Sequence, residues 1–139
     1  MTASEVYSIT STTYVKWKSA GQIGNVRLRL DLNDGTGGYP GIVTGPNVTY
    51  PNGESVPYNF DGDGAGAVCD SNNPCWPWTI PDSASLNARI RVESLDNPYS
   101  AANPMATYAA SNSKFTIRGS LAVTTPNGPQ TPHWKAGET

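Results

Sequence analysis

The chain has 139 residues and a formal net charge of −2 at pH 7, which fits one domain and excludes the basic surface of a nucleic-acid-binding protein. It contains 14 glycines and 12 prolines, and only 14% of its residues are charged, so strands and turns are favoured over helices. No apolar run approaches the roughly 20 residues of a membrane-spanning helix. We also expect no signal peptide at the polar segment Met1–Glu5.

Strict alternation of apolar and polar residues predicts two strands early in the chain, over Thr13–Trp17 and Val26–Leu32. In each strand the apolar residues point to a buried face and the charged residues point to solvent. Three weaker strands are expected further along, at Ile42–Thr44, Val48–Tyr50 and Val56–Phe60. The last of these is predicted to be an edge strand, because it contains a proline.

The clearest strand pattern lies in Trp76–Ile80 and Ala88–Val92. The first of these strands ends at Pro81, which cannot donate a hydrogen bond to a neighbouring strand. In the second, the arginines at alternate positions are expected on the outer face. Residues 96–112 are expected to form a loop, and Phe115–Ile117 is the next predicted strand.

Together these segments predict an all-β fold, a two-sheet antiparallel sandwich of about seven strands. The inward-facing apolar residues of the strands form the expected core. They are Val15, Trp17, Val26, Leu28, Leu30, Trp78, Ile80, Ile90, Val92, Phe115 and Ile117.

The two cysteines, Cys69 and Cys75, bracket a polar loop that contains a proline. Closing so short a loop with a disulfide stabilises a protein by about 2 kcal/mol in the chain-entropy model. A zinc site would need two further ligands, and the single histidine, His133, lies far along the chain. We therefore expect a structural disulfide, which implies an oxidising, extracellular or cell-surface location.

Catalytic residues are not evident in the sequence. His133 lies in a proline-rich segment, so no serine or cysteine nucleophile has an adjacent base. The glutamates lie near the termini, in a loop or on an outer strand face, at Glu5, Glu54, Glu93 and Glu138. The sequence therefore indicates a protein that is not an enzyme.

A weak calcium-loop pattern lies at Asp61 and Asp63, which are two residues apart and separated by glycine. Asp70 is the nearest further carboxylate that a calcium ion would use. No closing glutamate follows, and a solvated acidic turn is the alternative explanation. Apart from this possible calcium ion, no cofactor is expected.

Two sets of outward-facing residues are candidates for binding polysaccharide. The first is a basic stripe of Lys16, Lys18, Arg27, Arg29, Arg89 and Arg91, and the second is a set of tyrosines at positions 14, 39, 50, 58, 99 and 108. Ion pairs across neighbouring strands, with Asp31 and Glu93 as the acids, are the simpler interpretation of the stripe. Tyrosines that cover the rim of a small sandwich are the simpler interpretation of the second set.

The order of motifs along the chain resembles one family. A strand ending in Trp is followed by Gly-Asn-Val, by Trp-Thr-Ile-Pro-Asp, by Asn-Ala-Arg-Ile-Arg-Val, by Phe-Thr-Ile and by Leu-x-Val-x-x-Pro-Asn-Gly. These motifs stand at Trp17, Gly24–Val26, Trp78–Asp82, Asn87–Val92, Phe115–Ile117 and Leu121–Gly128. The chain thus resembles the Ig-like module of the yeast cell-wall glucan-synthesis N-terminal family, which recurs as tandem repeats in secreted prokaryotic proteins. The resemblance implies an Ig- or fibronectin-like sandwich. The long segment Tyr39–Cys75 departs from the short loop that the family has at this place.

The resemblance also implies a displaced strand. In the family, the Leu-x-Val-x-x-Pro-Asn-Gly strand opens the module, whereas here Leu121–Gly128 follows the last strand, and Tyr7 takes the place that Trp134 would take in the next module. We therefore expect residues 1–119 to form the Ig-like sandwich. Residues 120–139 are expected to be equivalent to the opening strand of the next module.

A sandwich without its first strand exposes an apolar groove and an unpaired edge. The residues expected to fill such a groove are Leu121, Val123, Thr125 and Trp134. The tail strand can fill the groove of its own chain, or that of another copy or an adjacent repeat. The second arrangement builds a head-to-tail filament or cell-surface array, because a heterologous contact of this kind does not close on itself. The alternative function is a carbohydrate-binding accessory module of a secreted enzyme or adhesin.

Overall fold

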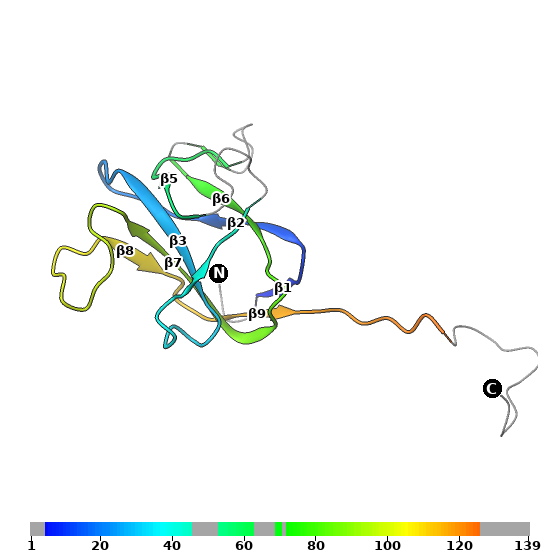
Figure 1. Ribbon diagram of the computed structural model, residues 1–139. Helices are drawn as coiled ribbons and strands as arrows, with labels where there is room; N and C mark the ends of the chain where they lie inside the picture. Colours follow the sequence, from blue (N-terminus) through cyan, green and yellow to red (C-terminus); the bar gives the residue numbers. More distant parts are fainter. Residues whose placement is uncertain (1–4, 46–52, 63–68, 71, 126–139) are drawn as a thin grey trace, which may run out of the picture.

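The computed structural model describes residues 5–45, 53–62, 69–70 and 72–125. The described residues form nine strands and no helix, so the predicted all-β class is confirmed (Figure 1). The strands make two sheets that face each other across a shared apolar core, as in a sandwich.

The larger sheet contains seven strands. They are β1 (Val6–Ser8), β3 (Asn25–Asp31), β4 (Gly41–Ile42), β5 (Val56–Pro57), β7 (Ser85–Ser94), β8 (Tyr108–Ala110) and β9 (Phe115–Arg118). Along the sheet the order is β1-β9-β7-β3-β4, with β5 also paired to β3 and β8 also paired to β7. The long strand β7 therefore pairs with β9 near its start and with β8 near its end.

In the described part of the chain, the smaller sheet consists of β2 (Thr12–Lys16) and β6 (Cys75–Thr79). The two strands are antiparallel, with a continuous register from Thr12 opposite Thr79 to Lys16 opposite Cys75. With only two strands, this sheet covers the inner face of the larger one and leaves one of its own edges beside a groove.

The core lies between the two sheets. Trp78 of β6 contacts Phe115 of β9 with ring centroids 5.6 Å apart and an interplanar angle of 79°, an edge-to-face arrangement that aromatic rings favour. The structure buries Val15, Trp17, Val26, Leu28, Leu30, Trp78, Ile80, Ile90, Phe115 and Ile117. Val92 packs against this core but remains partly exposed.

The expectation of an antiparallel sandwich is wrong at one pair of strands. β1 pairs with β9 in parallel, with Val6 opposite Thr116 and Ser8 opposite Arg118. A period of two residues shows that a strand is half-buried, but it carries no information about the direction of the neighbouring strand. The expected loop over 96–112 is also wrong in part, because β8 lies within it.

The outer face of the larger sheet is more buried than the alternation predicts. Asp31, Arg91 and Glu93 were expected to face solvent, but all three are buried. The cause is a cover of aromatic rings, since the Arg91 guanidinium lies 4.4 Å from the ring centroids of both Tyr39 and Tyr99. Such cation–π contacts allow a charge to be buried beside its acidic partner.

The expected strand at Leu121–Thr125 is absent from the single chain. Figure 1 shows this segment running away from the sandwich after β9, and its residues are in no strand. In this structure these residues therefore do not fill the groove of their own chain.

Candidate strand-binding groove

One edge of the smaller sheet, along β2, is open. Tyr14 lies opposite Pro77, which has no N–H, and the N–H of Trp17 donates to the Pro74 carbonyl at 3.2 Å. Bonded and non-bonded pairs alternate along an antiparallel ladder, so the backbone groups of Tyr14 and Lys16 point away from β6. Among the described residues, none of these groups has a hydrogen-bonding partner.

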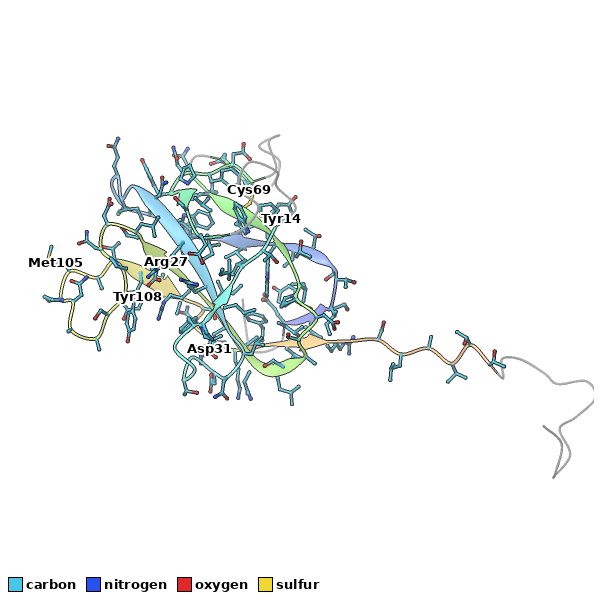
Figure 2. All side chains as sticks on the ribbon, viewed as in Figure 1. Tyr14, Arg27, Asp31, Cys69, Met105 and Tyr108 are labelled. Carbon is cyan, nitrogen blue, oxygen red and sulfur yellow. A yellow bond between two sulfur atoms is a disulfide. The ribbon has the colours of Figure 1, made fainter. Side chains whose placement is uncertain are left out.

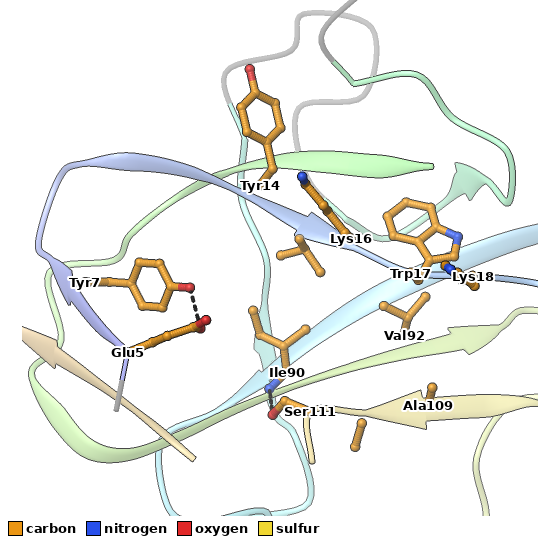
Figure 3. Close-up of a pocket in the computed structure, with 12 residues that line it drawn as sticks. Glu5, Tyr7, Tyr14, Lys16, Trp17, Lys18, Ile90, Val92, Ala109 and Ser111 are labelled. Atoms are coloured by element: carbon orange, nitrogen blue, oxygen red, sulfur yellow. Dashed lines mark hydrogen bonds between the residues drawn. The ribbon is translucent and has the colours of Figure 1, made fainter. Parts of the chain in front are cut away.

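A groove runs beneath this edge, between β2 and the larger sheet (Figure 3). The wall opposite β2 comes from β7 and β8, where Ile90, Val92 and Ala109 line the groove. Glu5 and Tyr7 lie at one end, and Trp17 and Lys18 lie at the other. The volume of this part of the groove is about 320 Å³.

The groove continues past Trp17 into a second hollow of about 240 Å³. Its lining includes Ile23 and Val26 on one side and Thr107 and Tyr108 on the other. Trp17 and Val92 line both hollows, so the two lie next to each other.

The floor of the groove is apolar and firmly held. Val15 and Ile90 are almost completely buried, and the Trp17 indole N–H donates to the Tyr58 carbonyl at 2.8 Å, which fixes the ring. Val92 is only partly buried because the groove opens above it. A rigid apolar floor beside unpaired backbone groups suits an extended peptide better than a polar small molecule.

At the Tyr7 end of the groove, the Tyr7 hydroxyl donates to the Glu5 carboxylate at 2.8 Å. Burial raises the pKa of the Tyr7 phenol above its ordinary value, and the hydrogen bond to Glu5 raises it further. Tyr7 also packs edge-on against Phe115 at 5.4 Å. This end of the groove is therefore closed by an aromatic side chain that is hydrogen-bonded to Glu5.

The predicted donor residues lie outside the sandwich. Leu121 is fully exposed and Val123 is 74% exposed, which is unusual for two apolar side chains on one face of an extended segment. Thr125 is exposed as well. Trp134 lies outside the described residues.

The four arginines of the basic stripe pair with neighbouring acids. Arg27 and Arg91 both pair with the buried Glu93 carboxylate, and the backbone N–H of Tyr99 donates to the same carboxylate at 2.9 Å. Arg89 pairs with Asp34 at 2.8 Å, and the guanidinium lowers the pKa of that carboxyl. Arg29 likewise pairs with Glu54 at 3.1 Å. The arginines therefore do not present a row of free cations to an acidic polysaccharide, and the remaining two members of the stripe, Lys16 and Lys18, line the groove.

The tyrosines proposed for sugar stacking do not form a flat platform in the described part of the chain. Tyr99 and Tyr108 are neighbours, with ring centroids 4.7 Å apart, but their planes are inclined by 75°. Tyr39 is buried against Arg91, and Tyr14 lines the groove. Tyr50 lies outside the described residues.

The disulfide joins Cys69 and Cys75, with their Cα atoms 5.6 Å apart. Within its loop, the Asp70 carboxylate accepts hydrogen bonds from the backbone N–H groups of Asn72 and Asn73, at 2.7 and 2.8 Å. Asp70 therefore stabilises the turn. Asp61 pairs with Cys75, the first residue of β6, in an isolated β-bridge.

For the calcium prediction, Asp63 lies outside the described residues. Within the described ranges, no group of three or more histidine, cysteine, aspartate or glutamate side chains is placed to hold a metal ion. The same residues include no helix long and apolar enough to cross a membrane.

Sequence reasoning missed the wall that β8 contributes. Ala109, Ala110 and Ser111 line the groove, but they lie in a segment whose small residues and prolines indicate a loop. The only signal for a strand was the short run Thr107–Ala110, which is too brief for a periodicity to stand out.

The chain was compared with protein-family models, with curated proteins and with solved structures, and none of them matches it.

Proposed function

We propose that this protein is a non-catalytic structural subunit or repeat that assembles head to tail by donating the strand Leu121–Thr125 to the groove of a neighbouring copy. The observation that carries the proposal is the pairing of an unfilled, apolar groove beneath an open strand edge with an exposed apolar segment in the same chain. Each feature is a liability in an isolated molecule, and each would cover the other.

The two parts match in length. β2 has five residues, and the donor segment Leu121–Thr125 also has five. An extended segment of this length spans about 16 Å. A docked segment would therefore pair with most of the β2 edge.

The parity of the side chains also matches. The side chains of Val15 on β2 and of Trp17, which follows β2, point inward, and the backbone groups of Tyr14 and Lys16 point to the open edge. A paired strand that turns Leu121 and Val123 inward would place Ala122 and Thr124 opposite these free backbone groups. The buried face would then be continuous across both strands.

The energies are of the size that assembly needs. Burying a leucine and a valine side chain stabilises by about 1.5–3 kcal/mol each, and each new backbone hydrogen bond contributes about 0.5–1.5 kcal/mol. Association costs about 4–15 kcal/mol. Because the gain exceeds the cost only when most contacts form, disrupting either partner should abolish assembly.

The disulfide fits an extracellular or cell-surface location, where such bonds persist. A head-to-tail contact of this kind continues from copy to copy, so the expected product is a filament of separate chains or an array of linked repeats. Neither product requires a catalytic residue or a cofactor.

The test uses two complementary variants of the full chain. Leu121→Asp/Val123→Asp destroys the donor and leaves the groove intact. Lys16→Pro removes a backbone N–H at the open edge and leaves the tail intact, and proline is tolerated at an edge position whose N–H faces solvent. We expect the unsubstituted chain to form oligomers that grow with concentration, each variant alone to remain monomeric, and an equimolar mixture to form a 1:1 pair, all measured by light scattering.

A matched control carries the same two charges on the opposite parity, as Ala122→Asp/Thr124→Asp. These side chains would face outward from the docked strand, so assembly should persist. If the unsubstituted chain stays monomeric at millimolar concentration and the mixture yields no pair, the proposed function is wrong. It is also wrong if the Leu121→Asp/Val123→Asp chain still assembles.

A further inference from the structure

Large exposed apolar side chains gather at the two ends of β7. Leu86 lies at its start and is 73% exposed, and Leu32 is exposed on the adjacent segment, whose carbonyl accepts a hydrogen bond from Ser85. Met105 lies in the loop after the other end and is 71% exposed, close in sequence to the exposed Tyr108. We name these pairs the leucine end and the methionine end.

The two ends are far apart. Leu86 and Glu93 lie seven residues apart on β7, and at about 3.3 Å per residue this separates the two ends by about 23 Å. Tyr108 pairs with Glu93, near the last residue of β7. Figure 2 shows Met105 and Tyr108 on the side of the molecule away from the tail.

The tail leaves the molecule at the leucine end. Ile117 of β9 pairs with Ser85, the residue next to Leu86, and β9 ends at Arg118. Only Gly119 and Ser120 separate β9 from the donor segment. Three chain steps extend at most about 10 Å, so Leu121 cannot reach far from the leucine end of its own body.

The groove has a direction as well. Its Trp17 end lies beside Thr107 and Tyr108, at the methionine end, whereas its Tyr7 end lies beside β9, from which the tail departs. A donated strand that starts at the Trp17 end runs antiparallel to β2 and leaves the acceptor's own tail unobstructed. A strand in the opposite direction would place the donor body where the acceptor's tail emerges.

We propose that consecutive copies make a second contact, in which the leucine end of the donor packs against the methionine end of the acceptor. This inference rests on the proposed strand donation. It follows from the short link, because Leu121 beside Trp17 of the acceptor brings the donor's Leu86 within reach of the acceptor's Met105 and Tyr108. The partner is thus a second copy of this chain. The contact joins two different surfaces, the leucine end of one copy and the methionine end of the next.

The test uses the 1:1 pair described above, in which the Lys16→Pro chain is the donor and the Leu121→Asp/Val123→Asp chain is the acceptor. Leu86→Asp is added to the donor in one experiment and to the acceptor in another, and Met105→Asp is treated in the same way. The dissociation constant of the pair is measured by fluorescence anisotropy with a labelled donor. Because both side chains are exposed in the single chain, thermal unfolding of each variant should remain unchanged.

We expect an asymmetric result. Leu86→Asp should weaken the pair about tenfold in the donor and have no effect in the acceptor, and Met105→Asp should do so in the acceptor and have no effect in the donor. If all four placements leave the dissociation constant unchanged, the second contact is wrong while strand donation stands. If Leu86→Asp weakens the pair from either side and Met105→Asp from neither, the strand enters in the opposite direction. If no pair forms before these substitutions are added, the proposed function itself has failed.

Discussion

The two edges of the small sheet differ in how their backbone groups are paired. On the β6 side, the N–H of Cys75 donates to the Phe60 carbonyl at 3.1 Å, and the N–H of Thr79 donates to the Thr44 carbonyl at 2.9 Å. On the β2 side, the corresponding groups of Tyr14 and Lys16 have no partner among the described residues. The comparison teaches that this fold protects one edge with its own chain and leaves the other open to a further strand.

The protection of the β6 edge comes from the long interval between β3 and β6. Thr44 and Phe60 both belong to the interval Tyr39–Cys75, and the disulfide at Cys69 and Cys75 ties the end of that interval to the start of β6. A role for this interval was not apparent from the sequence. The described part of it acts as a cover for one sheet edge and for the outer face beside Tyr39.

The largest contrast should be between a core residue on β6 and a donor residue on the tail. Trp78→Ala should destabilise the folded chain by about 3–5 kcal/mol, because a fully buried indole leaves a cavity between the sheets. Leu121→Ala should leave the free energy of unfolding of the monomer unchanged, since that side chain contacts no part of its own sandwich. Urea denaturation at low protein concentration measures both, and a measurable loss for Leu121→Ala would mean that the tail docks on its own chain.

The contrast between the edges themselves can be tested with proline. Thr79→Pro removes the hydrogen bond to the Thr44 carbonyl and leaves that acceptor unpaired, which should cost about 1.5 kcal/mol of stability. Lys16→Pro removes an N–H that faces the open groove, and should cost about 1 kcal/mol or less in the monomer. Equal losses in urea denaturation would show that the β2 edge is also satisfied in the isolated chain.

The disulfide should matter to the covered edge more than to the open one. Replacing Cys69 and Cys75 together by alanine should lower the free energy of unfolding by about 2 kcal/mol, through the greater entropy of the unfolded chain. Hydrogen exchange should accelerate at the start of β6, for example at Trp76. The affinity of the groove for a donated strand should change little. Uniform acceleration across both sheets would contradict this local role.

The smallest effect concerns the Tyr7 end of the groove. The raised pKa of Tyr7 means that the folded chain keeps the phenol proton at a pH where the unfolded chain, with an ordinary value of 10.0, releases it. Its contribution to stability is therefore complete below pH 10 and declines as the pH rises above that value. The free energy of unfolding of Tyr7→Phe should fall less steeply above pH 10 than that of the unsubstituted chain, and identical slopes would show that Tyr7 ionises freely when folded.

The amino-acid sequence by itself determined where most strands lie and which side chains face the core. Alternation at Val15 and Trp17, in Val26–Leu30 and in Trp78–Ile80 is a local property, because successive side chains of a strand point to opposite sides whatever its neighbours are. The cysteine pair could be predicted for a similar reason, since a short polar loop holds its two ends close together.

Only the tertiary structure decided which edges are paired and what the polar residues do. The parallel pairing of β1 with β9, the burial of Glu93 beneath Tyr99 and the groove wall at Ala109 all depend on segments that are distant in sequence. Such contacts leave no periodic pattern in the sequence, because the pattern of a strand indicates how buried each face is and not which segment covers it. For the same reason, the open edge of β2 can be recognised only from the positions of the other strands.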